Sequence, residues 1–320
     1  MKEMTVDIII PTYRPDEKFE ELLRRLDSQT YPIEKILVIN TEKIYWEQRN
    51  LDKKTTGENR LCKKTHLEVQ HIKAEEFDHG GTRAMAAEIC QGDVLLYMTQ
   101  DAMPADAYLV EHLVNALKKE KQVAAAYARQ LPAEDCNICE RYVRAFNYPE
   151  ESKVKTQKDL PVLGIKTYFC SDVCAAYRRE IYEKLGGFER QTIFNEDMIF
   201  AARLIQEGYA VAYEAKAKVI HSHNYSGLQQ FHRNFDLAVS QADHPEIFGQ
   251  VKSESEGIRL VKNTAAYLVR EKKAWMLPTL IWQSGWKYLG YRFGKNYRRL
   301  PKWMITAFTM NKKYWKNKFF

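Results

Sequence analysis

The sequence predicts an α/β fold in which helices cover both faces of a largely parallel sheet, with a basic and aromatic helical extension at the C-terminal end. Short apolar runs of strand length alternate with amphipathic stretches of about 10 to 15 residues through the first 130 residues. The hydrophobic content of 45% excludes a disordered chain. The last 59 residues have a different composition, and a chain of 320 residues is long enough for one large domain with such an appendage.

The first half of the chain shows this alternation most clearly. Residues 6–11 form an apolar run that predicts a buried strand. Residues 16–29 predict an amphipathic helix, because their apolar side chains fall on one helical face. The same patterns predict strands at residues 35–40, 67–72, 93–99 and 123–128, helices at 79–90 and 106–119, and a polar stretch at 41–65.

The second half has a less regular pattern. Residues 131–166 show no clean period and predict a loop or small subdomain over the site. Beyond them we expect helices at residues 178–185, 195–207 and 228–239, and strand-like segments at 210–213 and 218–223. The pattern divides the chain into a main body over residues 1–257 and a helical extension at 258–320.

The candidate functional residues follow the predicted strands. In an open parallel sheet, ligands bind beyond the carboxyl ends of the strands. The polar segments at those positions begin at Pro11, Asn40, Asp78 and Thr99. We therefore expect a binding site built from several of these segments.

Three groups of residues can carry chemistry, and each also has a plainer interpretation. Asp101 follows a strand, where a carboxylate can meet a hard cation or simply cap a turn. Glu196 and Asp197 open a predicted helix, where carboxylates are favoured by the helix dipole. His221 and His223 alternate on a predicted strand and so share a face, which favours a metal or phosphate site over two unrelated histidines.

The order of these motifs resembles the family 2 glycosyltransferases with the GT-A fold, a mixed sheet flanked by helices. The resemblance covers about residues 4–240 and, within the family, is to the rhamnosyltransferase branch. The motifs that carry it are Pro11-Thr-Tyr13, His79-Gly-Gly-Thr-Arg83, Thr99-Gln-Asp-Ala102, Ser171-Asp-Val173, Phe194-Asn-Glu-Asp197 and His221-Ser-His-Asn-Tyr225.

The resemblance implies that residues 1–257 form a catalytic domain, with a donor half at 1–130 and an acceptor half at 131–240. It also implies roles for individual residues. Asp101 matches the last carboxylate of the family's Asp-X-Asp motif and would bind a divalent metal, Mg²⁺ or Mn²⁺, with His221 or His223. Asp197 matches the catalytic base, and Glu196 would orient it or the sugar. Arg83 would face the diphosphate of the donor. The nucleotide-sugar site as a whole would comprise Pro11, Thr12, Tyr13, Asn40, Gly81, Arg83, Thr99 and Gln100.

The function that the resemblance implies is inverting transfer of a sugar onto a lipid-linked or surface polysaccharide. Thr99 and Asn40 stand where many relatives have Asp, which should weaken metal dependence or change the nucleotide contacts. The Thr-Gln-Asp form is typical of the rhamnosyl branch, which uses dTDP-L-rhamnose. The alternatives are a UDP-hexose donor on the same fold and a non-catalytic nucleotide- or glycan-binding scaffold.

Charge separates the C-terminal extension from the rest of the chain. The net charge of +7 comes from 49 basic and 42 acidic residues. Residues 262–320 contain 14 of the basic residues and only one acidic residue, Glu271, so their charge is +13 and that of residues 1–261 is −6. Five of the six tryptophans also lie in this extension. The overall basicity therefore says nothing about the substrate.

The extension admits three interpretations. Trp282, Trp286, Leu289 and Phe293 form a stripe at helical spacing near Lys287, Arg298 and Arg299, which favours attachment to an anionic membrane surface. The stripe could instead pack on the catalytic domain or on a second subunit in a homo-oligomer. Single-stranded nucleic acid is the third candidate, but no recognisable module accompanies it, so we expect no nucleic-acid partner.

The sequence also predicts where the protein is located and the state of its cysteines. The chain has no uncharged apolar run of about 18 residues and no signal-peptide pattern at its start, so we expect a cytoplasmic protein, peripheral on the inner face of the cell membrane. The six cysteines are too few for a disulfide scaffold. Cys136, Cys139, Cys170 and Cys174 could form a zinc site, but their irregular spacing favours two buried and two loop thiols.

Overall fold

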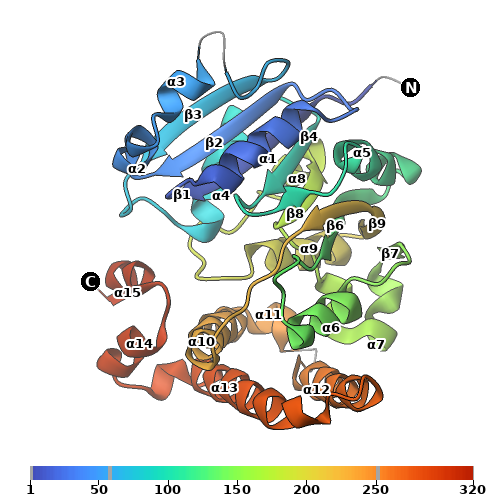
Figure 1. The fold of residues 1–320 in the computed structure, drawn as a ribbon, viewed down its shortest axis with the longest axis vertical. Helices are drawn as coiled ribbons and strands as arrows, with labels where there is room; N and C mark the ends of the chain where they lie inside the picture. The colour runs from blue at the N-terminus through green and yellow to red at the C-terminus, as the bar shows by residue number, and fades with distance from the viewer. Residues whose placement is uncertain (1–2, 57–59, 250–252, 320) are drawn as a thin grey trace.

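The computed structural model describes residues 3–56, 60–249 and 253–319, which contain one mixed sheet of nine strands (Figure 1). Along the sheet the strands lie in the order β3-β2-β1-β4-β8-β6-β9-β5, and β7 pairs with β9. The strands are β1 (Val6–Tyr13), β2 (Lys35–Thr41), β3 (His66–Ile72), β4 (Val94–Met98), β5 (Met103–Pro104), β6 (Val123–Leu131), β7 (Lys153–Lys155), β8 (Cys174–Arg178) and β9 (Ala210–Ile220).

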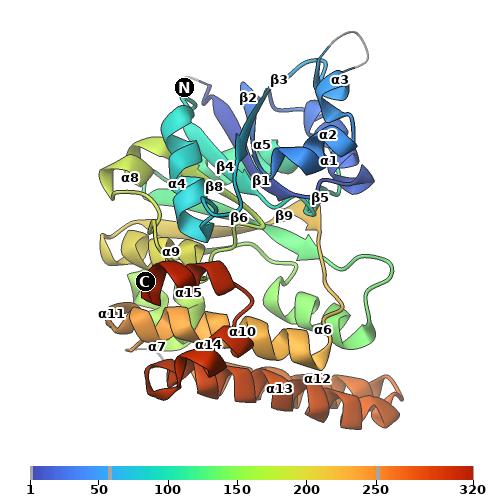
Figure 2. The same cartoon turned by 90° about the vertical axis from the view of Figure 1, so that its left-hand side faces the viewer.

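Helices cover both faces of the sheet (Figures 1 and 2), as the sequence predicted. Apolar side chains of α1 and α5 pack on one face, and those of α4, α8 and α9 pack on the other. The helices are α1 (Glu17–Asp27), α2 (Lys43–Gln48), α3 (Leu51–Thr55), α4 (His79–Ile89), α5 (Leu109–Lys119), α6 (Ile138–Asn147), α7 (Leu160–Leu163), α8 (Arg179–Lys184), α9 (Glu196–Gln206), α10 (Gly227–Asp243), α11 (Pro245–Phe248), α12 (Ser253–Arg270), α13 (Leu277–Lys295), α14 (Lys302–Phe308) and α15 (Lys312–Phe319).

Strands β1 to β4 form one parallel part of the sheet, and β6 and β9 form another parallel pair. β1 pairs in parallel with β2 and β4, and β2 pairs in parallel with β3. The register places Thr12 beside Asn40, so the carboxyl ends of β1 and β2 lie at one edge. Amphipathic α1 begins at an N-cap, where the side chain of Asp16 accepts a hydrogen bond from the amide of Phe19. The expectation of converging polar segments is confirmed for this part of the sheet.

The sheet also contains an antiparallel strand, β8, which the alternation of strands and helices did not predict. β8 pairs antiparallel with both β4 and β6. Its five residues, Cys174–Arg178, were not predicted as a strand, because a short run of small residues lacks a distinctive period. The mixed sheet that the family resemblance implied is confirmed.

Several predicted boundaries change in the structure. The segments at residues 210–213 and 218–223 belong to one strand, β9, whose pairing with β6 shifts between Ala128 and Arg129. β9 ends at Ile220, so His221 and His223 lie beyond the strand. Residues 131–166 contain α6, β7 and α7, and β7 pairs antiparallel with β9 of the main sheet. The polar stretch 41–65 includes the short helices α2 and α3, and α5 begins at Leu109 instead of residue 106.

The C-terminal extension packs on α10 through α13. A Cβ atom at Gly290 would lie 2.2 Å from the carbonyl oxygen of Phe231, and one at Gly294 would lie 2.3 Å from that of Phe235. Because glycine has no Cβ, the two helix backbones can approach this closely. Trp286 lies edge-to-face on the ring of Phe231. The expected boundary at residue 257 falls within α12.

The predicted aromatic stripe of α13 is divided between two faces. Trp286 and Phe293 turn inward to Phe231, whereas Trp282 and Leu289 are exposed. Packing on α10 therefore accounts for only half of the stripe. α12 and α13 lie at the end of the molecule furthest from β1 to β3 (Figures 1 and 2). Over residues 3–56, 60–249 and 253–319, none of the helices combines the length and apolarity that crossing a bilayer requires.

Candidate active site

One carboxylate and two imidazoles meet beside the sheet at the segments that follow β4 and β9. Oδ2 of Asp101 lies 3.5 Å from Nε2 of His221 and 3.3 Å from Nε2 of His223. Ligand atoms of the three residues all lie within 4.8 Å of one another, a spacing at which one ion can contact all three. His221 is buried, and Asp101 has 41% of its side chain exposed. We call Asp101, His221 and His223 the metal triad.

Distant backbone contacts hold the segment that carries both histidines. The amide of His221 donates to the carbonyl of Leu131 at 2.9 Å. The hydroxyl of Ser222 accepts a hydrogen bond from the amide of Ala133 at 3.0 Å. These contacts place the histidines together even though they lie outside the strand. Their rings are perpendicular, with centroids 4.6 Å apart. The predicted proximity is correct, but its cause is tertiary contact and not strand alternation.

The protonation tendencies of the triad suit a cation. Burial opposes ionisation of Asp101, but hydrogen bonding and charge from His221 outweigh it and lower the pKa of Asp101. Burial, followed by the nearby charge of His221, lowers the pKa of His223 to about 4. Near neutral pH the group therefore offers an anionic oxygen and a neutral His223, which are forms that bind metals.

Asp197 is positioned at the start of α9. Its Oδ2 accepts a hydrogen bond from the amide of Asp172 at 3.1 Å, and its Oδ1 accepts one from the amide of Met198 at 2.7 Å. Asn195 precedes it in the left-handed region, with φ of 65°, which turns the chain into the helix. Burial and the adjacent charge of Glu196 raise the pKa of Asp197 to about 7. A carboxylate with such a pKa can accept a proton near neutral pH.

Arg83 lies among carboxylates in the structure. Its Nη1 is 3.1 Å from Oε1 of Glu196, its Nε is 3.6 Å from Oδ2 of Asp172, and its side chain is only 8% exposed. It also donates to the carbonyl of His79 at 2.9 Å. The sequence placed this guanidinium at the diphosphate, but its charge is directed to buried acids. Arg83 is therefore positioned to hold the carboxylates of Glu196 and Asp172.

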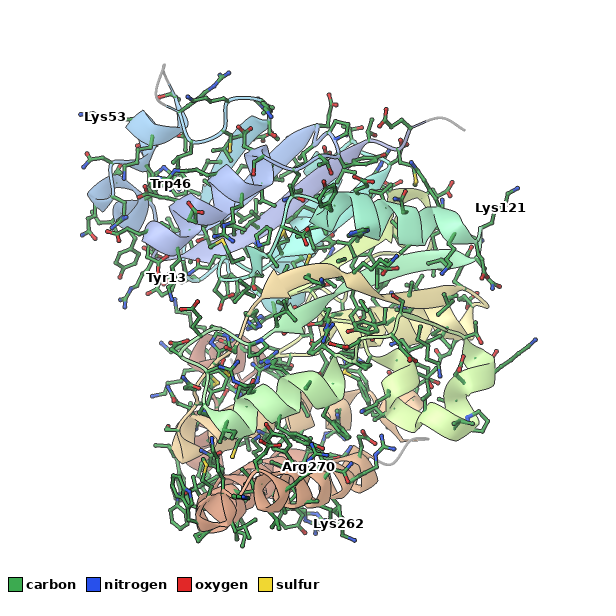
Figure 3. All side chains as sticks on the ribbon, turned by 45° about the vertical axis from the view of Figure 1, so that its right-hand side comes forward. Tyr13, Trp46, Lys53, Lys121, Lys262 and Arg270 are labelled. Atoms are coloured by element: carbon green, nitrogen blue, oxygen red, sulfur yellow. The ribbon has the colours of Figure 1, made fainter. Side chains whose placement is uncertain are left out.

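The ends of β1 and β4 are joined through Gln100. Its Oε1 accepts hydrogen bonds from the amide of Tyr13, at 2.8 Å, and from the hydroxyl of Thr12. Its Nε2 donates to the carbonyl of Tyr13 at 3.1 Å. Tyr13 is 45% exposed and lies at the edge of the upper half of the molecule (Figure 3). The ring of Tyr45 meets it edge-to-face.

The remaining predicted donor residues lie around this edge. Asn40 is buried, its Nδ2 lies 2.9 Å from Nδ1 of His71, and its Oδ1 has no hydrogen-bond partner among the described residues. Pro11 pairs in register with Ile39. Thr99 donates its amide hydrogen to the carbonyl of Val173 at 3.2 Å. Pro11, Thr12, Tyr13, Asn40, Thr99 and Gln100 therefore come together at the ends of adjacent strands, as predicted.

Gly81 has a structural explanation of its own. Its amide donates to Oδ1 of Asp78 at 2.8 Å, so Asp78 caps the start of α4. A Cβ atom at Gly81 would lie 2.7 Å from the carbonyl oxygen of Arg190. The segment before α9 therefore lies so close to α4 that only glycine fits at position 81. Gly81 connects α4 to the segment that leads into Glu196 and Asp197.

Sequence reasoning missed three residues of this site. Asp172 is buried, and burial together with the charge of Asp197 raises its pKa well above the ordinary value. Gln130 contacts His221 at 3.0 Å between its Oε1 and the ring Nδ1. Arg233 of α10 stacks its guanidinium on the ring of Phe194, 4.7 Å from the centroid. The Ser171-Asp-Val173 motif pointed to Asp172, but no local pattern distinguishes Gln130 or Arg233 from ordinary polar residues.

The cysteines do not form a metal site in the described parts of the chain. All six are buried free thiols. The groups of potential ligand atoms within metal-binding distance over residues 3–56, 60–249 and 253–319 reduce to the triad, with no sulfur among them. Cys136 and Cys139, expected in a loop, are buried at and within the start of α6. All four cysteines of the candidate zinc site are therefore buried, whereas only two of them were expected to be.

Comparisons with known proteins agree with this geometry. The family model for Glycosyl transferase family 2 matches residues 7–186. The O-antigen chain rhamnosyltransferase RfbN of Salmonella typhimurium is 37% identical over 318 residues, which cover 98% of this chain and 97% of RfbN. The O-antigen chain rhamnosyltransferase WbaN of Salmonella anatum is 37% identical over 316 residues, 97% of this chain and 95% of WbaN.

Solved structures share the fold. The mannosyltransferase PcManGT from Pyrobaculum calidifontis, in complex with GDP-Man and Mn²⁺, superposes with a TM-score of 0.59 at 16% identity, covering 92% of this chain and 88% of PcManGT. S. aureus TarS 1-349 in complex with UDP-GlcNAc gives a TM-score of 0.53 at 14% identity, with 92% of each chain covered. These likenesses confirm the predicted GT-A architecture. With a family model over more than half its length and near-complete alignment to two family relatives, the chain belongs to glycosyl transferase family 2.

Proposed function

We propose that the chain is an inverting, metal-dependent rhamnosyltransferase that moves L-rhamnose from dTDP-L-rhamnose to a lipid-linked or surface polysaccharide. The observations that carry the chemistry are the metal triad and the carboxylate of Asp197, which the amide of Asp172 holds in place. The sugar and acceptor class are supported by RfbN and WbaN, both O-antigen chain rhamnosyltransferases aligned over almost the whole chain.

The triad fits a divalent metal with some affinity for nitrogen. Asp101, His221 and His223 would hold the ion, which would neutralise charge on the diphosphate when bound. Mg²⁺ prefers oxygen ligands and keeps several waters, so two imidazoles favour Mn²⁺ over Mg²⁺. Asn40 supports a nucleotide at this edge as well, because its buried Oδ1 has no hydrogen-bond partner among the described residues.

Asp197 performs the proton transfer in this proposal. It accepts the proton of the acceptor hydroxyl as that oxygen attacks the anomeric carbon opposite the diphosphate. Two amides fix its two oxygens, so it remains aimed while the acceptor binds. Glu196 is held by Arg83 and keeps the pKa of Asp197 raised.

Arg233 replaces Arg83 as the proposed cation for the diphosphate. It lies near both ends of the site, since its charge contributes, after burial, to the lowered pKa of His79 and of His223. No carboxylate within ion-pair distance is found for it in the part of the chain that the structure describes. A half-buried guanidinium on the ring of Phe194 is preorganised to bind anionic oxygen.

We further propose that the exposed face of the extension binds an anionic membrane surface. The exposed large apolar side chains of α13 and of the segments on either side of it, which we call the exposed apolar face, are Trp275, Ile281, Trp282, Tyr288, Leu289 and Trp303. Exposed Lys272, Lys273 and Lys302 flank it. Aromatic and aliphatic side chains bordered by lysine are the composition of interfacial helices. Figure 3 places Lys262 and Arg270 of neighbouring α12 at this same end of the molecule.

Donor choice and metal dependence can be tested together. Purified protein is titrated by calorimetry with dTDP, UDP and GDP, with Mn²⁺ or EDTA, and then assayed for transfer from dTDP-L-rhamnose to a lipid-linked acceptor. We expect dTDP to bind most tightly, and only with Mn²⁺. Preferential UDP binding would support a UDP-hexose donor instead, and no nucleotide binding would support the scaffold alternative.

A further inference from the structure

Gln130 near the end of β6 makes three side-chain hydrogen bonds from a buried position. Its Oε1 lies 3.0 Å from Nδ1 of His221 and also accepts a hydrogen bond from Arg144. Its Nε2 donates to the hydroxyl of Ser171 at 3.0 Å. Only 3% of the residue is exposed, so these partners replace water for the amide.

The orientation of the Gln130 amide follows from Arg144. A guanidinium can only donate, so the atom of Gln130 that faces it must be the oxygen. Arg144 is itself held by Glu140, with 2.7 Å between Nε and Oε1, and both side chains are largely covered. The position of a fixed donor therefore determines which end of the amide faces His221.

The same oxygen determines the tautomer of His221. Because Oε1 can only accept, neutral His221 must carry its proton on Nδ1. In this neutral form the lone pair is on Nε2, the atom that faces Asp101 at 3.5 Å, so this is the form of His221 that can bind a metal ion together with Asp101. His223 has no comparable partner at Nδ1 among the residues the structure describes, and its ring instead stacks on Tyr225.

Gln130 also lies between the metal triad and Asp197. Ser171, which accepts from Nε2 of Gln130, directly precedes Asp172 in the chain. The amide of Asp172 holds the carboxylate of Asp197 at 3.1 Å. Hydrogen bonds therefore connect His221 to Gln130 and Gln130 to Ser171. The next residue in the chain, Asp172, holds the proposed base, Asp197.

We propose that Gln130 is a positioning residue that fixes the Nδ1–H tautomer of His221, so that His221 is the preset nitrogen ligand of the metal triad. The proposal rests on the metal site proposed above. It also assigns different roles to the two histidines, because within the described residues only His221 has an acceptor at Nδ1 that sets its tautomer, whereas His223 contacts Asp101 through Nε2 and stacks on Tyr225. Outer partners of this kind typically change metal affinity by about 10- to 100-fold.

The first experiment reads the tautomer without metal or substrate. Protein labelled with ¹⁵N-histidine is studied by long-range ¹H–¹⁵N NMR at pH 8, with His221 assigned through His221→Gln. We expect the Nδ1–H form at His221 in the wild type. In Gln130→Met, which has a similar shape and no acceptor oxygen, the signal should move toward the Nε2–H form that free histidine favours. A wild-type His221 in the Nε2–H form would overturn the proposal.

The second experiment measures Mn²⁺ binding by electron paramagnetic resonance. Gln130→Met should weaken binding about 10- to 100-fold. Gln130→Glu keeps an acceptor for both His221 and Arg144, so it should stay within a few-fold of the wild type. Gln122→Met, an exposed change just before the same strand, is the matched control and should have no effect. Circular dichroism checks that each variant is folded.

The outcomes separate this proposal from the proposed function. If wild type binds no Mn²⁺ and yet shows the Nδ1–H form that Gln130→Met loses, the tautomer assignment stands and the metal role fails. If Gln130→Met is folded and binds Mn²⁺ as tightly as wild type, the positioning role is wrong. If Gln130→Met does not fold, Gln130→Glu decides: loss of the Nδ1–H form despite the retained acceptor would contradict the proposal.

Discussion

The main-chain amide of Asp172 donates a hydrogen bond to Oδ2 of Asp197 across 3.1 Å. The two residues come from different parts of the fold, the approach to β8 and the start of α9. Asp172 is buried beside Tyr177, whose hydroxyl donates to its carboxylate at 2.7 Å. The sheet therefore fixes the direction of the carboxylate on which the proposed chemistry depends.

Replacing Asp197 by Asn should remove transfer and spare binding. The amide side chain keeps the shape and can still accept from Asp172, but it cannot take a proton. A general base contributes about 10²- to 10⁴-fold, so we expect kcat to fall by at least this range. Calorimetry should show nucleotide affinity within a few-fold of wild type. Near-normal turnover in Asp197→Asn would contradict the assignment of the base.

The pH dependence of transfer should report Asp197. Its pKa, raised to about 7, means that the carboxylate is largely protonated and inactive below pH 6 and available above pH 8. The value of kcat/KM should therefore rise with pH through about 7. Glu196→Gln removes the neighbouring charge that raises this pKa, so the rise should move to lower pH. A pH profile that does not shift in Glu196→Gln would argue against the coupling.

Asp101→Ala should abolish tight Mn²⁺ binding. It removes the one anionic ligand of the triad, and we expect a loss of about 100-fold or more, at or beyond the upper end for outer-shell partners. Electron paramagnetic resonance of Mn²⁺ gives the affinity directly. Asp106→Ala is the control, since Asp106 only accepts from the amide of Tyr108 in the next turn. Equal Mn²⁺ affinities for the two variants would show that Asp101 is not a ligand of the metal.

Two glycines of α13 should respond in opposite ways to alanine. Gly290→Ala places a Cβ against the carbonyl of Phe231 and should destabilise the protein by about 1–3 kcal/mol. Among the described residues, no atom outside the adjacent backbone of α13 and the two chain neighbours lies within 4 Å of a Cβ at Gly285, so Gly285→Ala should stabilise by about 0.5–1 kcal/mol through higher helix propensity. Urea unfolding measures both. Similar effects would mean that α13 does not pack on α10 as described.

Membrane binding is better tested by point changes than by truncation. Ending the chain near residue 257 would uncover Phe231 and Phe235 on α10, and new exposed apolar surface could itself bind lipid or aggregate. We expect Trp275→Ser and Trp282→Ser each to weaken co-sedimentation with anionic vesicles, by about 10-fold if the ring is fully buried in lipid.

The control for these tryptophans is Tyr108→Ser, which removes an aromatic side chain of similar exposure from the catalytic half. It should leave vesicle binding unchanged. High salt should weaken binding of the wild type, since exposed lysines flank the apolar face. Binding that survives both tryptophan changes would place the attachment elsewhere or remove it.

The sequence by itself determined the elements and the residue types of the site. Apolar runs and helical periods are local properties, so β1, α1 and β2 could be predicted from short windows. The family motifs then pointed to Asp101 and Asp197 as the candidate metal ligand and the candidate base. α13 was also predictable as a helix, but not the face that it buries, because Gly290 and Gly294 act only through their contact with α10.

Tertiary structure alone decided the partners. Arg83 opens α4 as predicted, yet packing against α9 and the approach to β8 directs it to Glu196 and Asp172. Gln130 looks like an ordinary strand residue until the chain brings His221, 91 positions away, within 3.0 Å of it. A local pattern fixes which side chains are available, whereas the low dielectric and close packing of the interior fix which of them must pair.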